Sequence, residues 1–147
     1  MRIATSRRAF AATGLAILAI TSSVTTAQAA PTPQPTLRTA GCPGDGKIGP
    51  GAACTSLSSG ALFHYKFDNG TKYEVVSYYQ KVSGGQISGQ LGYTYKGRDS
   101  WGSKFTQTAG TRKTSTWHPD GVTTCSPTIG LLRVDGQGTF QTPLAHC

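Results

Sequence analysis

The alternation of apolar and polar residues along the chain predicts a series of short β-strands. An alternating run, Ala61–Phe67, and a β-rich run, Thr71–Tyr79, flank Asp68-Asn69-Gly70, a combination typical of a β-hairpin. Further strands are expected at Gln90–Lys96, Ser103–Thr108, Arg112–Trp117, Ile129–Val134 and Thr139–Thr142. No segment keeps a helical apolar period over three turns. The pattern therefore predicts an all-β sandwich or barrel of about six to eight short antiparallel strands.

The register of this hairpin decides which side chains share a face. A three-residue loop, Asp68–Gly70, pairs Tyr65 with Tyr73, whereas a two-residue loop mixes apolar and charged groups on one face. We therefore expect the three-residue loop, which gathers an apolar inner face of Phe63, Tyr65, Phe67, Tyr73 and Val75. The opposite face then carries polar side chains: His64, Lys66, Lys72 and Glu74.

The first thirty residues have the three parts of an export signal. These are a basic start with Arg2, Arg7 and Arg8, a short apolar stretch at Ala11–Ile20, and a small-residue cleavage site at Ala27–Ala29. Ser6–Phe10 also resembles a twin-arginine export signal, and both export routes stay open. We expect residues 1–30 to be removed and the protein to be secreted and extracellular, with no membrane anchor left after cleavage.

The mature chain divides into a linker and one small domain. Residues 31–41 are rich in proline and form an extended linker, and residues 42–147 form a single all-β domain. Its four cysteines indicate two disulfides in an oxidising compartment. Local pairing, Cys42 with Cys54 and Cys125 with Cys147, is preferred, and a Cys42–Cys147 bridge is the alternative.

A moderate positive charge remains after removal of the signal. The fourteen Lys and Arg, less three in the signal, stand against six acids, which leaves a net charge of +5. This balance favours an anionic cell-surface polymer as partner, although solubility alone explains it equally well. Nucleic acid is a weaker expectation, because the densest basic run is only Arg112-Lys113.

The chain lacks the catalytic residues that several classes of enzyme require. Four of the six acids have turn positions: Asp45, Asp68, Asp120 and Asp135. Only Glu74 and Asp99 remain, a poor pair for a glycosidase. There is no Gly-x-Ser-x-Gly elbow and no His-Glu-x-x-His, and the cysteines are accounted for as disulfides. We therefore expect no metal and no cofactor.

The aromatic residues are the first candidates for a binding site. From Gly41 onward there are twelve, against fourteen Ile, Leu and Val, so the core must use many of them. Tyr and Trp rings stack on sugar rings, and their polar tips tolerate water. The candidate ligand-binding residues are Trp101, Trp117, Tyr93 and Tyr95. Of these, Trp101 is expected to be the most exposed, because it stands between a serine and a glycine.

The polar face of the hairpin supplies weak catalytic candidates. Glu74 could act as general base, His118 or His64 as general acid, and Arg112 as phosphate clamp. This set resembles that of small secreted microbial guanyl-type ribonucleases, which use a Glu, an Arg and a His on an antiparallel sheet. The resemblance is one of composition, and those enzymes carry a helix that the pattern here does not predict.

Three functions therefore stand as hypotheses. The leading one is a monomeric, non-enzymatic extracellular module that binds a polysaccharide or another cell-surface ligand. A ribonuclease-like general acid–base enzyme is the first alternative. A protein inhibitor or toxin that contacts a protein target through Gly44–Gly51 or Gly84–Gly89 is the second.

Overall fold

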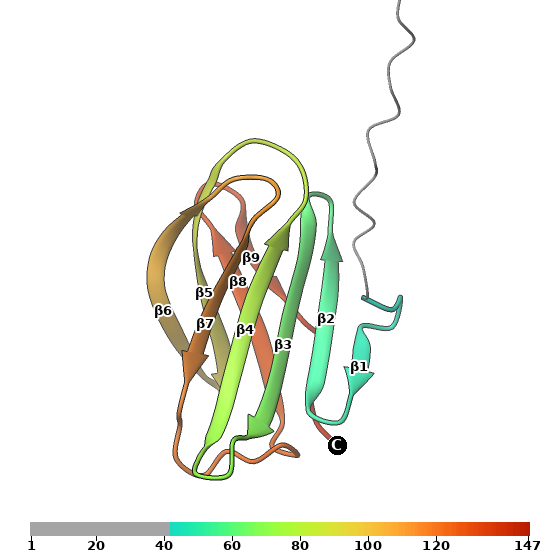
Figure 1. Cartoon of the computed structure of the whole chain (residues 1–147), viewed down its shortest axis with the longest axis vertical. Coiled ribbons are helices and arrows are strands. Elements are labelled where there is room, and N and C mark those ends of the chain that lie inside the picture. The colour runs from blue at the N-terminus through green and yellow to red at the C-terminus, as the bar shows by residue number, and fades with distance from the viewer. Residues whose placement is uncertain (1–41) are drawn as a thin grey trace, which may run out of the picture. The chain divides into compact units, whose positions relative to one another are not determined.

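The computed structural model describes residues 42–147, which form an all-β domain (Figure 1). The predicted export signal and the proline-rich linker lie outside the described residues. Nine strands follow one another along the chain: β1 (Lys47–Gly49), β2 (Ala52–Leu57), β3 (Gly60–Asp68), β4 (Tyr73–Lys81), β5 (Ile87–Tyr95), β6 (Arg98–Gln107), β7 (Arg112–Trp117), β8 (Thr128–Val134) and β9 (Gly138–Gln141). No helix in the described range is long and apolar enough to cross a membrane.

The strands form two antiparallel sheets that pack face to face. Sheet A has the order β1-β2-β3-β4-β7, and sheet B has the order β6-β5-β8-β9 (Figure 1). The prediction of a disulfide-stapled antiparallel sandwich or barrel is confirmed, and the structure is the sandwich. The strand number is nine rather than six to eight, because β1 and β2 arise in a stretch rich in glycine, alanine and cysteine that lacks a clear alternation.

The predicted register of the β3–β4 hairpin is wrong. Asp68 pairs with Tyr73, so the loop consists of four residues, 69–72, instead of three. The side chain of Asn69 stabilises the longer loop, because its Oδ1 accepts the backbone N–H groups of Thr71 and Lys72 at 3.0 and 2.9 Å. This Asx-type turn holds Thr71 and Lys72, the two loop residues that the prediction placed in a strand.

The shift is by an odd number of positions, so it changes which residues share a face. Phe63 pairs with Tyr78, and His64 pairs with Ser77. His64 and Lys66 face sheet B, where they contact Thr128 and are 0% and 3% exposed, rather than solvent. The predicted polar face of the hairpin does not exist as one surface.

The hydrophobic core between the sheets contains two clusters of buried residues at different levels along the strands. Its main cluster consists of Leu62, Tyr79, Leu91, Leu132 and Val134. A second cluster joins Val75, Tyr93 and Val122, with Trp117 packed against it. Polar side chains of β3 share this interior: His64 pairs with Ser77, which lies between Tyr79 and Val75 on β4, and Lys66 pairs with Val75 of the second cluster.

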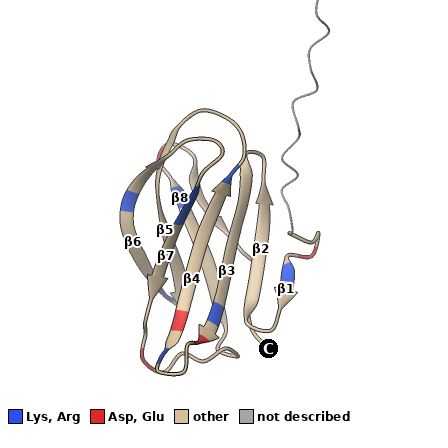
Figure 2. Ribbon diagram, in the orientation of Figure 1, with Lys and Arg blue, Asp and Glu red and all other residues tan. Residues whose placement is uncertain are grey.

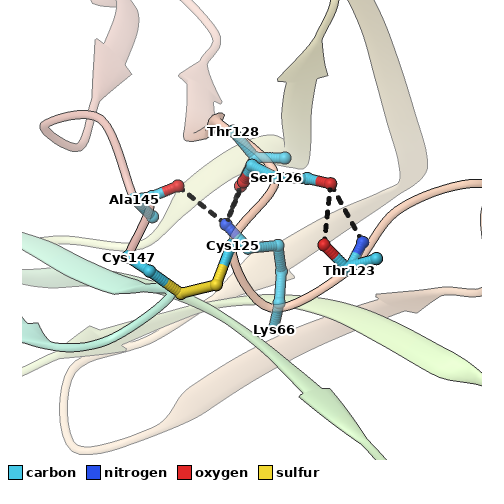
Figure 3. Close-up of a disulfide and its surroundings, with 7 residues drawn as sticks. All are labelled: Lys66, Thr123, Cys125, Ser126, Thr128, Ala145 and Cys147. Atoms are coloured by element: carbon cyan, nitrogen blue, oxygen red, sulfur yellow. Dashed lines mark hydrogen bonds between the residues drawn. A yellow bond between two sulfur atoms is a disulfide. The ribbon is translucent and has the colours of Figure 1, made fainter.

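Both disulfides have the predicted local pairing. Cys42 is bonded to Cys54 on β2, and Cys125 is bonded to Cys147. The first disulfide packs with Ala61 and Phe63 on sheet A. The second joins the β7–β8 connection to the segment that follows β9 (Figure 3).

Candidate functional site

The outer face of sheet A carries a continuous group of aromatic rings, here called the aromatic face: Phe63, Tyr65, Phe67 and Tyr78. The observed register produces it, because Phe63 and Tyr78 are direct cross-strand partners on β3 and β4. Their ring centroids lie 4.6 Å apart with an interplanar angle of 10°. Such a pair contributes packing energy beyond its buried area and holds both rings in place.

The ring group continues along β3 toward solvent. Tyr65 meets Tyr78 edge-on at 6.2 Å between centroids, and Phe67 lies 5.9 Å from Tyr65. Phe67 is 39% exposed, the only aromatic side chain among the strongly exposed hydrophobic residues of the described domain. The aromatic face is therefore anchored at Phe63 and open at Phe67.

Arg112 fixes the second face of the Tyr78 ring. Its guanidinium lies 4.5 Å from the ring centroid, and its Nε donates to Gln80 Oε1 at 3.1 Å. Burial raises the pKa of Tyr78, so the phenol keeps its proton at neutral pH and can serve as a hydrogen-bond donor. Tyr78 is thus a support, and Tyr65 and Phe67 present the accessible ring surface.

Hydroxyl groups border the aromatic face on β7. Thr114 pairs with Tyr78 and Thr116 pairs with Val76, and both threonines are exposed. On the other side the surface is bordered by the Cys42–Cys54 disulfide. The result is a sheet surface with rings at its centre and small polar groups at one margin.

The four predicted ligand-binding aromatics do not share a surface. Tyr93 is 5% exposed and packs against Trp117 in the core, with ring centroids 5.1 Å apart, so its ring has no surface to offer a ligand. Tyr95 donates its hydroxyl proton to the Gly121 oxygen at 3.0 Å. Trp101 lies on the outer face of sheet B, where the Arg133 guanidinium covers its ring at 4.1 Å.

His64 is part of a hydrogen-bond chain inside the sandwich. Ser77 donates its hydroxyl proton to the Gly92 oxygen at 3.0 Å, so Ser77 Oγ must accept from His64 Nδ1, also at 3.0 Å. His64 Nε2 is then an acceptor and receives the proton of Thr128 Oγ1 at 2.8 Å. Burial, followed by the nearby Lys66 charge, lowers the pKa of His64 to about 3, so the ring is neutral.

Lys66 is the last member of this hydrogen-bond chain and lies near the Cys125–Cys147 disulfide (Figure 3). Its three ammonium protons have three acceptors: Thr128 Oγ1 at 2.8 Å, the Ser126 oxygen at 2.7 Å and the Ala145 oxygen at 2.7 Å. Burial lowers the pKa of Lys66 to about 8, which leaves the side chain mainly protonated at pH 7. All the hydrogen-bonding groups of the His64 and Lys66 side chains therefore have partners inside the domain, and Thr128 is shared between them.

Of the catalytic candidates, the structure brings together only Glu74 and His118. His118 Nε2 lies 3.3 Å from Glu74 Oε1, which also accepts from Asn69 Nδ2 at 2.6 Å. His64 points into the opposite side of the sheet. Arg112 pairs with Gln80, six positions along β4 from Glu74, or roughly 20 Å. The predicted clamp is too far from the predicted base to act on one phosphate.

The positive charge is dispersed over the strands (Figure 2). Residues 42–147 contain ten Lys and Arg and six acids, a surplus of four. Lys66 and Lys81 are buried, which reduces the surplus at the surface to two. Within the same residues there is no group of three His, Cys, Asp or Glu side chains that could hold a metal ion.

Comparison with protein-family models, with curated proteins and with solved structures finds no match for this chain. Any function is therefore inferred from the geometry of the described domain. Sequence reasoning placed Phe63, Tyr65 and Phe67 on the core side of the hairpin and so missed the aromatic face. Their alternation was visible, but it does not show which sheet face is covered.

Proposed function

We propose that the domain is a non-enzymatic extracellular binding module whose aromatic face binds a polysaccharide. The observation that carries this proposal is the exposure of Phe67 at the open end of a continuous ring group. Burying an aromatic ring contributes strongly to association, so a protein that leaves one exposed in an ordered group offers a contact surface.

The chemistry of the aromatic face suits a sugar ring. The C–H side of a pyranose packs on an aromatic ring, and the ring hydroxyls need polar partners at the margin. Phe67 and Tyr65 offer the apolar surface, and the Tyr65 hydroxyl with the exposed Thr116 on β7 offers polar groups. Because stacking already orders these rings, little side-chain entropy is lost on binding.

The charge distribution favours a neutral or weakly charged polysaccharide. With two of the cations buried, the surface surplus of the described residues is small, and no basic side chain is stacked on Phe67 or Tyr65. Electrostatic attraction to an anionic polymer would be weak and easily screened by salt. A flat β-linked glucan or chitin is therefore the preferred ligand class.

Retention on insoluble glucan, chitin and peptidoglycan tests the proposal. Phe67→Ala and Tyr65→Ala should each reduce retention about tenfold or more, and retention should change little between low and high salt. Trp101→Ala is the matched control, because that ring lies on the outer face of sheet B. Retention that is lost in Trp101→Ala but kept in Phe67→Ala, or no retention on any matrix, would refute the proposal.

The Glu74–His118 contact favours one second candidate, the ribonuclease-like enzyme. A carboxylate 3.3 Å from an imidazole at the surface can exchange protons with a substrate. This candidate predicts cleavage of single-stranded RNA that Glu74→Gln and His118→Ala abolish. Intact RNA after prolonged incubation with purified protein would exclude it.

A further inference from the structure

A cleft of about 220 Å³ opens between the two sheets at the end where β4 ends and β5 begins. In Figure 1 this is the upper end of the domain. Its walls combine apolar side chains with polar ones: Leu57, Ile87, Leu132, Val134 and Phe140 lie beside Ser59, Gln86 and Gln137. Leu132 and Val134 belong to the main core cluster, and the other three apolar residues pack against it. The cleft is therefore an access route from solvent to the hydrophobic core.

One charged side chain, Lys81, lines this cleft. It follows Tyr79 on the inner face of β4 and is only 2% exposed. Its Nζ donates to the Ser83 oxygen at 2.5 Å. An ammonium has three protons to donate, so two have no acceptor among residues 42–147. The ion pairs within these residues are Lys104–Asp135 and His118–Glu74, and neither involves Lys81.

The other buried lysine shows what a fully satisfied ammonium looks like in this protein. Lys66 has an acceptor for each of its three protons, two of them backbone oxygens. A buried charge without such partners is expensive, because desolvation of an ion costs several kcal/mol. Lys66 and Lys81 lie roughly 20 Å apart along the sheet, so the Lys66 network cannot supply the missing acceptors.

We propose that the cleft binds a small carboxylate with an apolar body, and that Lys81 binds its carboxylate group. The anion would supply the acceptors that Lys81 lacks, and the apolar side chains on the walls, such as Ile87 and Phe140, would cover the rest of the molecule. A cavity of about 150 Å³ is known to hold benzene, so this cleft accommodates one such ring with a short acid side chain. The site is independent of the aromatic face.

Both parts of the ligand are needed for affinity. A neutral compound of the same shape would leave the Lys81 ammonium buried against an uncharged group, and loss of a charge-assisted hydrogen bond costs about 1.5–3 kcal/mol. A carboxylate without an apolar body would leave Ile87 and Phe140 uncovered. Binding should therefore depend on the combination and exceed that of either part alone.

Titration with three probes tests this site. Sodium phenylacetate should bind, whereas 2-phenylethanol and sodium acetate should bind roughly ten- to a hundredfold more weakly by calorimetry. In nuclear magnetic resonance spectra of the wild-type protein, phenylacetate should shift the signals of Ile87 and Phe140 and leave those of Phe67 unchanged. Equal affinity for 2-phenylethanol or acetate, or shifts that map elsewhere, would overturn the proposal.

A lysine substitution gives the second test. Lys81→Met keeps the length and apolar volume of the side chain and should reduce phenylacetate affinity at least tenfold. Lys72→Met, in the exposed hairpin loop at the other end of β4, is the control and should bind as the wild type does. Unchanged binding in a folded Lys81→Met would refute the assignment. If that variant does not fold, the comparison of the three probes and the mapped shifts decide alone.

Discussion

The hydroxyl of Thr128 lies 2.8 Å from His64 Nε2 and donates the hydrogen bond that this unprotonated nitrogen accepts. The same oxygen accepts a proton from Lys66 at 2.8 Å, so one hydroxyl serves two buried basic side chains. Thr128→Val keeps the shape and removes both bonds. Leaving two buried polar groups unpaired should lower the free energy of unfolding by about 2–4 kcal/mol.

Urea denaturation measures this effect. Thr116→Val is the control, because Thr116 lies exposed on the outer face of sheet A and should change stability by less than about 0.5 kcal/mol. Equal effects of the two substitutions would show that the interior hydrogen-bond chain contributes nothing to stability.

Stability should fall as the pH is lowered below the ordinary pKa of histidine. Burial lowers the pKa of His64 from 6.5 to about 3 in the folded protein. Between these values the unfolded chain binds a proton that the folded chain does not. The free energy of unfolding therefore decreases with falling pH, by up to about 1.4 kcal/mol per pH unit from this group.

Nuclear magnetic resonance resolves this prediction residue by residue. The His64 ring signals should show no protonation shift from pH 7 down to about pH 4.5, as long as the protein is folded. A titration of His64 with a midpoint near 6 would contradict the buried, neutral ring.

Gly130 makes room for the His64 side chain. A Cβ atom built on Gly130 would lie 2.4 Å from His64 Cβ, closer than two carbon atoms can approach. Gly130→Ala should therefore push the sheets apart and destabilise the protein by about 1–3 kcal/mol or more. Gly49→Ala is the control, because no atom lies within 4 Å of its Cβ position. Thermal unfolding of the two variants compares them directly, and similar midpoints would exclude the close packing.

The Cys125–Cys147 disulfide and Lys66 should be energetically coupled. Two of the three Lys66 acceptors, the Ser126 and Ala145 oxygens, lie within two residues of this disulfide (Figure 3). Replacing both cysteines by serine should cost about 3 kcal/mol and loosen those acceptors. Lys66→Met should then be more favourable in the serine background than in the wild type, by about 1 kcal/mol.

The other disulfide provides the matched background for this cycle. Cys42 and Cys54 lie at the outer face of sheet A and make no contact with Lys66. In a variant with serine at both of these positions, the effect of Lys66→Met should be additive. Equal coupling to both disulfides, or to neither, would contradict a specific link between Lys66 and Cys125–Cys147.

The parts of the fold that depend on nearby residues could be predicted from the sequence. β7 occupies the expected range Arg112–Trp117, whose centre is the run Thr114-Ser115-Thr116. The two disulfides join cysteines 12 and 22 residues apart, the local pairing that the spacing favours. The antiparallel sandwich follows from many short alternating runs separated by turn residues.

The register and the site depended on distant contacts. Both faces of β3 are largely buried, because Phe63 packs on one side and Leu62 on the other, so apolar alternation alone could not orient the strand. The inward position of Lys66 is possible only because acceptors arrive from residues 60 to 79 positions away. The residues near Lys66 in the sequence do not indicate these acceptors. Without them Lys66 was expected to face solvent, and the aromatic residues of β3 were therefore assigned to the wrong face.

The long reach of the Lys66–Ala145 bond sets an order of events during synthesis. At about 5–20 residues per second, the 79 residues that separate the two positions take on the order of 4–16 s to make. During that time β3 can form its hairpin with β4, but the Lys66 ammonium on β3 must remain in water, because its acceptors have not yet been made. Closure of the two sheets around Lys66 therefore waits for the segment that follows β9. Until then the newly made chain stays open and accessible to chaperones or to an export machinery.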